Sequence, residues 1–355
     1  MSRTAYAPAL PPPWQRRKEL ARAAHIAGAI IRGLPPLDRP VEGWTVQGGR
    51  ITEAGVAKLM LGPPDHAPGA VLKLALTSEA TRSLSTERAA LASVEADERL
   101  ADWHHLVPGI LIHGELDGAD YLLERGLRGR NAGSLLGTVP PRRVLQALAA
   151  DAISTLHERT AVATVASVAT VDRWLRDPVR FVVRAALACR GAPGPLAFNR
   201  VAAEIKASLV GRRLTVSWIH GNFWLGNLLV EGDGGPVTGI VDWDCAGRHE
   251  LPVLDVLHLL VCTRTFVERK ELGGVVRGLL EGADWTQQEV SLLHSHDAEL
   301  VADPAYARAM LLLCWLRHLA SKLAQSNRCL NSHVWLARNV EPALRLFERP
   351  ARRRR

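Results

Sequence analysis

The 355-residue chain has few cysteines and no long apolar segment. None of its five cysteines stands in a CxxC pair, so the sequence encodes neither a disulfide framework nor a zinc knuckle. The longest apolar run in a helix-like segment is Ala309–Leu316, far below the ~18 residues of a membrane span. The N-terminus lacks the basic start, apolar centre and cleavage site of a secretory signal. We therefore expect a cytoplasmic protein that does not act at a membrane.

Several catalytic and metal-binding motifs are also missing. The chain contains neither a Walker G-x4-G-K-[ST] loop nor a G-x-S-x-G elbow, which removes the sequence support for a P-loop nucleotide site or a serine hydrolase. His104-His105 and the pair His294 and His296 lack a third ligand at zinc spacing. We expect no zinc at either place.

Basic residues are unevenly distributed in kind and in position. The net charge is +8, but the segment 338–355 alone carries seven Arg against two Glu, so we expect a solvated basic tail at 351–355 and no nucleic-acid partner. Only six of the 44 basic residues are lysines. A lysine within an apolar strand of this protein therefore requires an explanation.

The N-terminal third alternates with the period of β-strands. After a Pro-rich start and a helix at 15–33, the pattern predicts an antiparallel meander with a turn at Gly48-Gly49. The expected strands are 41–46, 56–61, 70–76, 110–113 and 121–124, with a helix at 78–100.

The remainder is mostly helical, with one β island. The island comprises the short apolar runs 216–219, 228–230 and 239–241. Expected helices are 140–158, 172–190, 198–210, 255–280, 287–299, 303–325 and 331–348. The fold class is therefore α+β, with an N-terminal extension at 1–40, a small sheet lobe at 41–125, a hinge near Arg125–Arg130 and a helical lobe at 126–350.

The densest polar cluster lies in this β island. The chain reads His220-x-Asn222-x4-Asn227, followed by Val241-Asp242-Trp243-Asp244. These polar residues stand at the ends of short apolar strands, where reacting groups and metals are commonly held. A carboxylate, an amide oxygen and substrate phosphates together form the oxygen-rich ligand set that Mg²⁺ prefers.

These motifs resemble those of the aminoglycoside phosphotransferase superfamily, which includes choline, fructosamine and homoserine kinases. Its catalytic loop reads H-G-D-x4-N and its metal strand I-D-[WFP]-[EDG], and Pro252-x-x-Asp255 is similar to its P-x-x-D segment, whose Asp braces the catalytic loop. The resemblance spans residues 44–325. It implies a protein-kinase-like two-lobe fold with a small antiparallel β-sheet N-lobe, a mainly helical C-lobe and a catalytic loop within 218–244. It also implies ATP and Mg²⁺ as cofactors, with Asn227 and Asp242 as metal ligands.

The resemblance further implies a lysine and a glutamate in the N-lobe. Lys73 stands in the middle of the apolar strand 70–76, where it is costly unless a phosphate and a carboxylate compensate it. We expect Glu87 in the following helix to be its partner. The alternative is a snorkelling surface lysine and an ordinary solvated glutamate.

Two further segments resemble nucleotide-binding elements of the family. Tyr121-Leu-Leu-Glu124-Arg125-Gly126 resembles the hinge, whose backbone would contact adenine, and Gly48 and Gly49 would form the loop over the phosphates. A Gly pair between strands is also simply a common turn.

One position departs from the family pattern. Asn222 stands where the family has the catalytic Asp, and an amide cannot accept the proton of the substrate hydroxyl. One interpretation is a working kinase in which Asp244 or the substrate compensates. Another is a nucleotide-binding pseudokinase that acts as a scaffold or protein partner, and the third is a substrate-binding member with altered chemistry. His220 is expected to be structural.

The charge balance also bears on the substrate. Basic and acidic residues alternate along the C-terminal helices without an acidic excess. A polycationic aminoglycoside is therefore a poor fit, and the sequence favours a neutral or anionic hydroxylated small molecule.

Overall fold

The computed structural model describes residues 13–33, 43–137, 142–187, 195–325, 329 and 332–348. They fall into two compact units: a sheet unit within 13–137 and 226–246, and a helical unit within 142–225 and 247–348. The segment 218–244 is therefore divided between the units, and the basic tail lies outside the described residues. Every described helix is too short or too polar to cross a bilayer.

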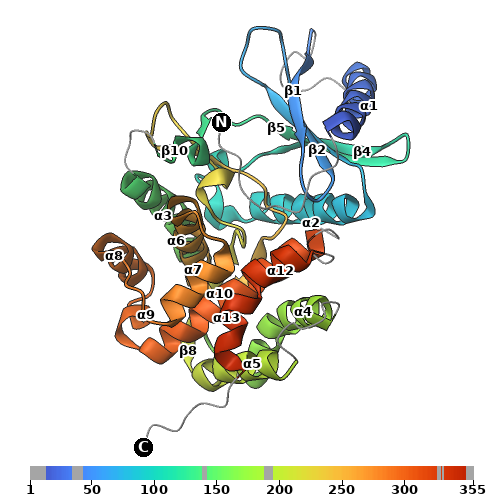
Figure 1. The fold of residues 1–355 in the computed structure, drawn as a ribbon. Coiled ribbons are helices and arrows are strands. Elements are labelled where there is room, and N and C mark those ends of the chain that lie inside the picture. Colours follow the sequence, from blue (N-terminus) through green and yellow to red (C-terminus); the bar gives the residue numbers. More distant parts are fainter. Residues whose placement is uncertain are drawn as a thin grey trace, which may run out of the picture. The chain divides into compact units, whose positions relative to one another are not determined.

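The sheet unit contains a five-stranded antiparallel sheet in the order β1-β2-β3-β5-β4. Alternation along the strands makes one face apolar, where Leu59 and Leu72 pack with Ile26 of α1. Lys58 and Lys73 are out of phase with these leucines and lie on the other face. In Figure 1, α1 is the dark blue helix beside β1. The elements are α1 (Pro13–Arg32), β1 (Thr45–Ile51), β2 (Val56–Gly62), β3 (Ala70–Ala75), α2 (Ser78–Glu95), β4 (Ile110–Leu116) and β5 (Ala119–Arg125).

The sequence-based prediction of a turn at Gly48-Gly49 is wrong. Both glycines lie within β1, next to a bulge that follows Val46. A Cβ at Gly49 would collide with a Leu59 methyl carbon, so glycine allows β1 to approach β2 closely. The chain turns instead at 52–55, where Gly55 has a φ of +83°.

Helix α2 is shorter than the sequence predicts. It begins at a Thr77 cap, whose hydroxyl accepts the backbone N–H of Ala80, and it ends at Glu95. The chain then continues as a 3₁₀ turn at Glu98–Leu100 that is capped by Asp97. The Asp side chain competes for backbone donors and so ends the regular helix.

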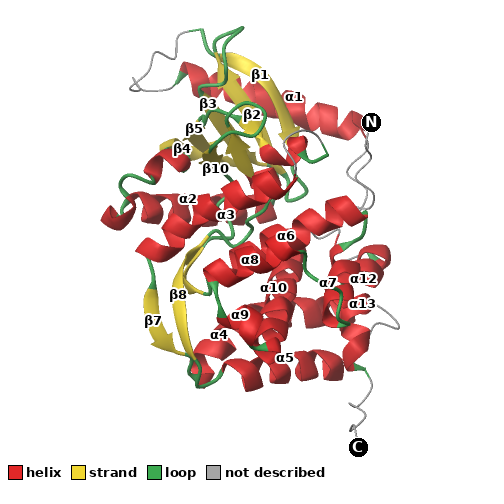
Figure 2. Ribbon diagram, turned by 90° about the vertical axis from the view of Figure 1, so that its left-hand side faces the viewer, coloured by secondary structure: helices red, strands yellow, loops and turns green. Residues whose placement is uncertain are grey.

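The three runs of the expected β island do not form one sheet. In the sheet unit, β9 (Leu228–Val230) pairs with β10 (Val237–Ile240) and β6 (Arg130–Asn131). In the helical unit, β8 (Arg213–Ile219) pairs with β7 (Val162–Val165) and β11 (Gly247–Glu250). Figure 2 shows β7 and β8 side by side. β8 therefore does not join the same sheet as β9 and β10, although these strands follow it in the sequence.

The helical unit is organised around α10, which is buried along Ala309–Leu316. This eight-residue run is apolar on every side because helices surround it. The helices are α3 (Arg142–Arg159), α4 (Val168–Leu187), α5 (Pro195–Leu209), α6 (Val253–Glu268), α7 (Leu272–Leu280), α8 (Gln287–His296), α9 (Glu299–Ala302), α10 (Pro304–Gln325), α12 (His333–Asn339) and α13 (Glu341–Leu344).

Three helices expected as continuous are interrupted. The 255–280 segment breaks at Arg269, which adopts a left-handed φ of 52° between α6 and α7. The 287–299 segment breaks at Asp297, which ends α8. The 331–348 segment breaks before Pro342, which lacks the N–H needed to continue α12 and opens α13 instead.

Candidate functional site

Lys73 lies at the centre of a buried charge cluster in the sheet unit. It is 2% exposed. Its Nζ lies 2.6 Å from Glu87 Oε1, 2.9 Å from Glu124 Oε1 and 3.4 Å from Asp242 Oδ1. The ion pair predicted between Lys73 and Glu87 is therefore present. Although burial opposes the charged form, these carboxylates raise the pKa of Lys73 well above its usual value, and it stays an ammonium.

Glu87 also holds the segment that carries Asp242. Its Oε1 accepts the backbone N–H of Trp243 at 3.0 Å. The indole of Trp243 is fully buried, donates to the Ile240 carbonyl at 2.8 Å and meets Trp103 edge to face. These contacts fix Asp242 at a φ of +69°, a conformation that is uncommon for a residue with a side chain.

The structure places the Glu124 side chain differently from the sequence interpretation. The expected contribution of this residue was its backbone, but its carboxyl group points inward because Glu124 lies opposite Val71, on the same face as Lys73. It is 2% exposed, and its Oε1 is within ion-pair reach of Lys73 but outside hydrogen-bond geometry. Burial, opposed by Lys73, raises the pKa of Glu124 to about 8. At neutral pH this carboxyl group is therefore largely protonated.

Gly126, directly after β5, has a packing role. Its N–H donates to the Gly69 carbonyl at 2.9 Å, so this donor is already used within the protein. A Cβ would lie 2.6 Å from the Pro68 carbonyl oxygen, which only glycine avoids. Contact with a purine base from this segment would have to use other backbone groups.

Lys58 is the residue that the sequence interpretation missed. Its Nζ lies 2.5 Å from Asp242 Oδ1, the oxygen that Lys73 also approaches. Although burial alone would raise the pKa of Asp242, the two ammonium groups hold it well below its usual value. The signal was available, because Lys58 is one of six lysines and stands in a run as apolar as that around Lys73.

Asn227 and Asp242 provide oxygen donors of the kind that Mg²⁺ binds. Asn227 is buried directly before β9, and its backbone carbonyl accepts the Val241 N–H at 2.9 Å. This bond places Asn227 and Asp242 at the same end of the β9–β10 hairpin. The donor set fits magnesium in kind, although Lys58 already contacts one of the Asp242 oxygens.

Asp244 is tied to α2. Its Oδ2 accepts the Ser83 hydroxyl at 2.7 Å, and the residue is partly buried. This bond holds the carboxylate toward the helix that carries Glu87. That Asp244 compensates for Asn222 stays a prediction.

The helical unit braces the loop that carries Asn222. The fully buried Asp255 accepts the backbone N–H groups of His220 and Gly221, each at 2.8 Å, and His157 Nε2 lies 3.1 Å from its carboxylate. Burial opposes the charged form of Asp255, but its bond to His157 lowers the pKa below the usual value. His220 is itself fully buried and accepts the Asn222 N–H at 3.3 Å. These contacts agree with the structural role expected for His220 and with the brace expected of Asp255.

A buried histidine pair contacts the same loop at Phe223. His258 Nδ1 lies 2.9 Å from the Phe223 carbonyl oxygen, and its Nε2 lies 2.9 Å from His318 Nδ1 and 3.4 Å from Cys262 Sγ. This separation of the two histidine nitrogens is shorter than the roughly 3.3 Å expected for two nitrogens on a tetrahedral zinc, and it is typical of a direct hydrogen bond. Because burial lowers the pKa of His258 to about 4, the pair is neutral and hydrogen-bonded.

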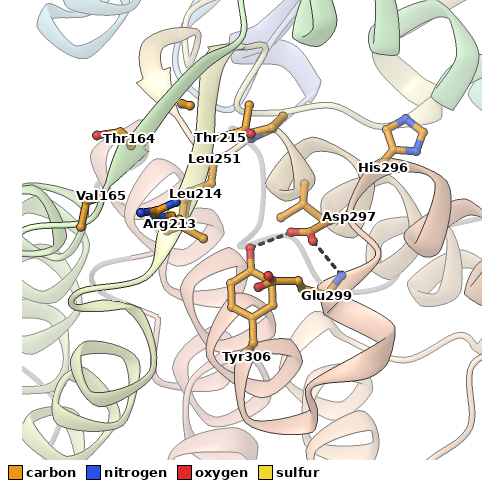
Figure 3. A pocket seen from close by; sticks show the side chains of 13 residues that line it. Thr164, Val165, Arg213, Leu214, Thr215, Leu251, His296, Asp297, Glu299 and Tyr306 are labelled. Carbon is orange, nitrogen blue, oxygen red and sulfur yellow. Dashed lines mark hydrogen bonds between the residues drawn. The ribbon is translucent and has the colours of Figure 1, made fainter.

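A cavity of about 590 Å³ lies elsewhere in the helical unit (Figure 3). It is lined by β7, β8 and the α8–α10 region, and none of the predicted site residues is among its lining residues. The Tyr306 hydroxyl donates to Asp297 at 2.6 Å on its wall. Two of its polar side chains are therefore bonded to each other, and no residue of the charge cluster lines the cavity.

Comparison with known proteins places these features in a family. Residues 62–293 match the model of the phosphotransferase enzyme family. The chain belongs to this family. Among the curated proteins, none matches the chain.

A solved phosphotransferase structure shares the fold, and a second is similar. Aminoglycoside 2'-phosphotransferase-IIIa in its GDP complex aligns with a TM-score of 0.53 and 14% identity, over 91% of this chain and 97% of that one. Aminoglycoside phosphotransferase APH(3'')-Id from Streptomyces rimosus ATCC10970, in complex with ADP and streptomycin, has a TM-score of 0.49 and 18% identity, over 83% and 98%. The first alignment confirms the kinase-like α+β fold that the sequence predicts.

Proposed function

We propose that this phosphotransferase family member uses ATP and Mg²⁺ to phosphorylate a hydroxyl group of a small metabolite. The observation that carries the proposal is the buried Lys73, paired with Glu87 beside Asp242. Burying this many charges in a sheet is costly, and a purely structural role would be served as well by apolar residues. A polyphosphate ligand gives the ammonium a function.

Each residue of the sheet unit has a proposed role. Lys73 binds phosphate oxygens, and Asn227 and Asp242 hold Mg²⁺, which neutralises charge on the phosphates when it is bound. The carbonyl groups near Glu124 and Gly126 contact the purine. The β1–β2 turn, which follows Gly48 and Gly49, covers the phosphates. The matched GDP complex makes GTP the first alternative to ATP.

Asn222 is proposed to orient the acceptor hydroxyl. The hydroxyl oxygen forms a bond to the γ-phosphorus, the bond from this phosphorus to the leaving diphosphate breaks, and the hydroxyl proton passes to solvent or to phosphate. The Asn222 amide accepts a hydrogen bond from the hydroxyl but does not take its proton. General-base catalysis contributes roughly 10²–10⁴ in rate, so we expect slow turnover.

The substrate is proposed to be a neutral or anionic hydroxylated molecule. The support is the absence of an acidic excess along the C-terminal helices of the sequence. The test is a mass-spectrometric screen of sugars, amino sugars and amino alcohols with ATP or GTP and Mg²⁺. We expect a gain of one phosphate on a sugar or a related alcohol, and phosphorylation of polyamine antibiotics alone would contradict the proposal.

The second candidate is a nucleotide-binding pseudokinase, and Asn222 is the observation that favours it. Such a protein would bind ATP through Lys73 and present this state to a protein partner. Single-turnover transfer separates the two candidates. Tight nucleotide binding together with no transfer to any acceptor, and no hydrolysis, would favour the pseudokinase.

A further inference from the structure

Lys58 contacts the Asp242 oxygen that a divalent cation would need. The Lys58 Nζ lies 2.5 Å from Oδ1, and the Lys73 Nζ lies 3.4 Å from the same atom. The side chains of Lys58 and Asp242 are 12% and 20% exposed, so water screens the contact only in part. Magnesium binds a carboxylate oxygen at ~2.0–2.1 Å. It cannot share this oxygen with two ammonium groups unless at least one of them moves away.

Strand register explains why Lys58 reaches this position. Arg50 in β1 lies opposite Lys58, and Lys58 lies opposite Lys73 in β3. Residues that lie directly opposite one another project to the same face, so adjacent strands carry a row of cations across it. Like charges in such positions repel one another, and nearby anions must compensate. Asp242 compensates Lys58, and Glu87 compensates Lys73.

The row of three cations can bind a polyphosphate, because its positive charges neutralise the phosphates in place of metal ions. It runs from the buried Lys73 through the partly buried Lys58 to the exposed Arg50. Lysine binds phosphate as a compact point charge, and arginine can bind it through two N–H groups. The end of the row at Arg50 is therefore open to an anionic ligand.

We propose that Lys58 is a built-in counter-ion of Asp242 that takes the place of one divalent cation. The site then binds the phosphates of a nucleoside triphosphate through Arg50, Lys58 and Lys73, and this binding step depends little on Mg²⁺. The Mg²⁺ of the proposed transfer step reaches Asp242 only when Lys58 moves away from it. The choice of ligand rests on the proposed function. Competition between Lys58 and a metal ion for Asp242 does not require a nucleotide, so it can be measured in the nucleotide-free protein.

The first experiment titrates the nucleotide-free protein with Mn²⁺ and follows free Mn²⁺ by electron paramagnetic resonance. Lys58→Met removes the competing charge, and we expect it to bind one Mn²⁺ at least about tenfold more tightly than the natural chain. Adding Asp242→Asn to this variant should abolish the gain. Lys18→Met, an exposed lysine on α1, should behave as the natural chain does. Equal Mn²⁺ affinity in the natural chain and in Lys58→Met would overturn the counter-ion role.

The second experiment measures the affinity for a fluorescent ATP analogue in Mg²⁺ and in EDTA. For the natural chain we expect the two values to agree within about threefold, and for Lys58→Met we expect binding in EDTA to weaken by roughly 10- to 100-fold. An equal requirement for Mg²⁺ in both proteins would overturn the inference. If nucleotide does not bind either protein, the proposed function fails, and the Mn²⁺ titration still decides the role of Lys58.

Discussion

Glu87 accepts the backbone N–H of Trp243, 156 residues further along the chain, at 3.0 Å. The same oxygen accepts the Lys73 ammonium at 2.6 Å. One helical residue therefore sets the position of the buried lysine and of the segment that carries Asp242. This double role makes α2 the element that aligns the candidate site within the sheet unit.

Glu87→Gln should destabilise the protein and weaken nucleotide binding. Breaking a buried ion pair costs about 3–5 kcal/mol, and because Lys73 retains the charged Asp242 we expect about 2–3 kcal/mol here. Thermal and urea unfolding measure the loss. The matched control is Glu95→Gln, which changes an exposed residue on the same helix and should shift stability by less than about 0.5 kcal/mol. Equal effects of the two substitutions would contradict the aligning role of Glu87.

Glu124→Gln should be far milder at neutral pH, although Glu124 is equally buried. Because burial raises the pKa of this carboxyl group to about 8, the amide replaces a group that is already largely neutral. A raised acid pKa favours folding below the usual glutamate value, and this advantage is lost as the pH rises toward 8. Relative to the variant, the natural chain should therefore lose unfolding free energy between about pH 4.3 and pH 8. Unfolding free energies that change in parallel with pH in the two proteins would show that Glu124 is ionised throughout.

Asn222→Asp should raise turnover and leave nucleotide affinity unchanged. The carboxylate would accept the hydroxyl proton, and we expect the single-turnover rate to rise by roughly 10²–10⁴. Asn222→Ala removes the amide without supplying a base and serves as the control. Equal rates in the natural chain and in Asn222→Asp would show that the amide is no handicap and that another group manages the proton.

Asp255→Asn should reduce the unfolding free energy above pH 5 and make this free energy depend less on pH in the acidic range. The pKa of Asp255 is lowered in the folded protein, so its stabilisation is complete above the usual value of about 3.9 and disappears as the pH falls through the lower folded value. The difference in unfolding free energy between the two proteins should be constant from pH 8 to pH 5 and shrink below about pH 4. A difference that does not change with pH would contradict the assignment of a charged brace.

The sequence predicts the parts of the site that depend on local signals. Lys73 stands out because lysine is scarce and the strand is apolar, and the helix after it offers a glutamate at a suitable separation. Lys58 meets the same criterion, but only its register opposite Lys73 shows that both lysines face Asp242. The inward orientation of Glu124 likewise follows from its pairing with Val71, which no local pattern encodes.

The errors in the fold have the same origin. The β island was predicted from three neighbouring apolar runs, yet β8 pairs with β7 and β11 in the helical unit. Strand composition indicates that a strand forms, whereas its partner is decided by long-range packing. The expected Gly48-Gly49 turn failed because glycine serves close strand approach as well as turns, and only the contact with Leu59 distinguishes the two.

The central claim is that Lys73 binds the phosphates of a nucleotide. The most direct measurement is calorimetric titration of the natural chain and of Lys73→Met with ATP and with GTP, in Mg²⁺ and in EDTA, after circular dichroism has shown that both proteins are folded. We predict that the natural chain binds one of the nucleotides and that the variant binds it roughly 10- to 100-fold more weakly. No binding to the natural chain, or equal binding to a folded Lys73→Met protein, would contradict the account.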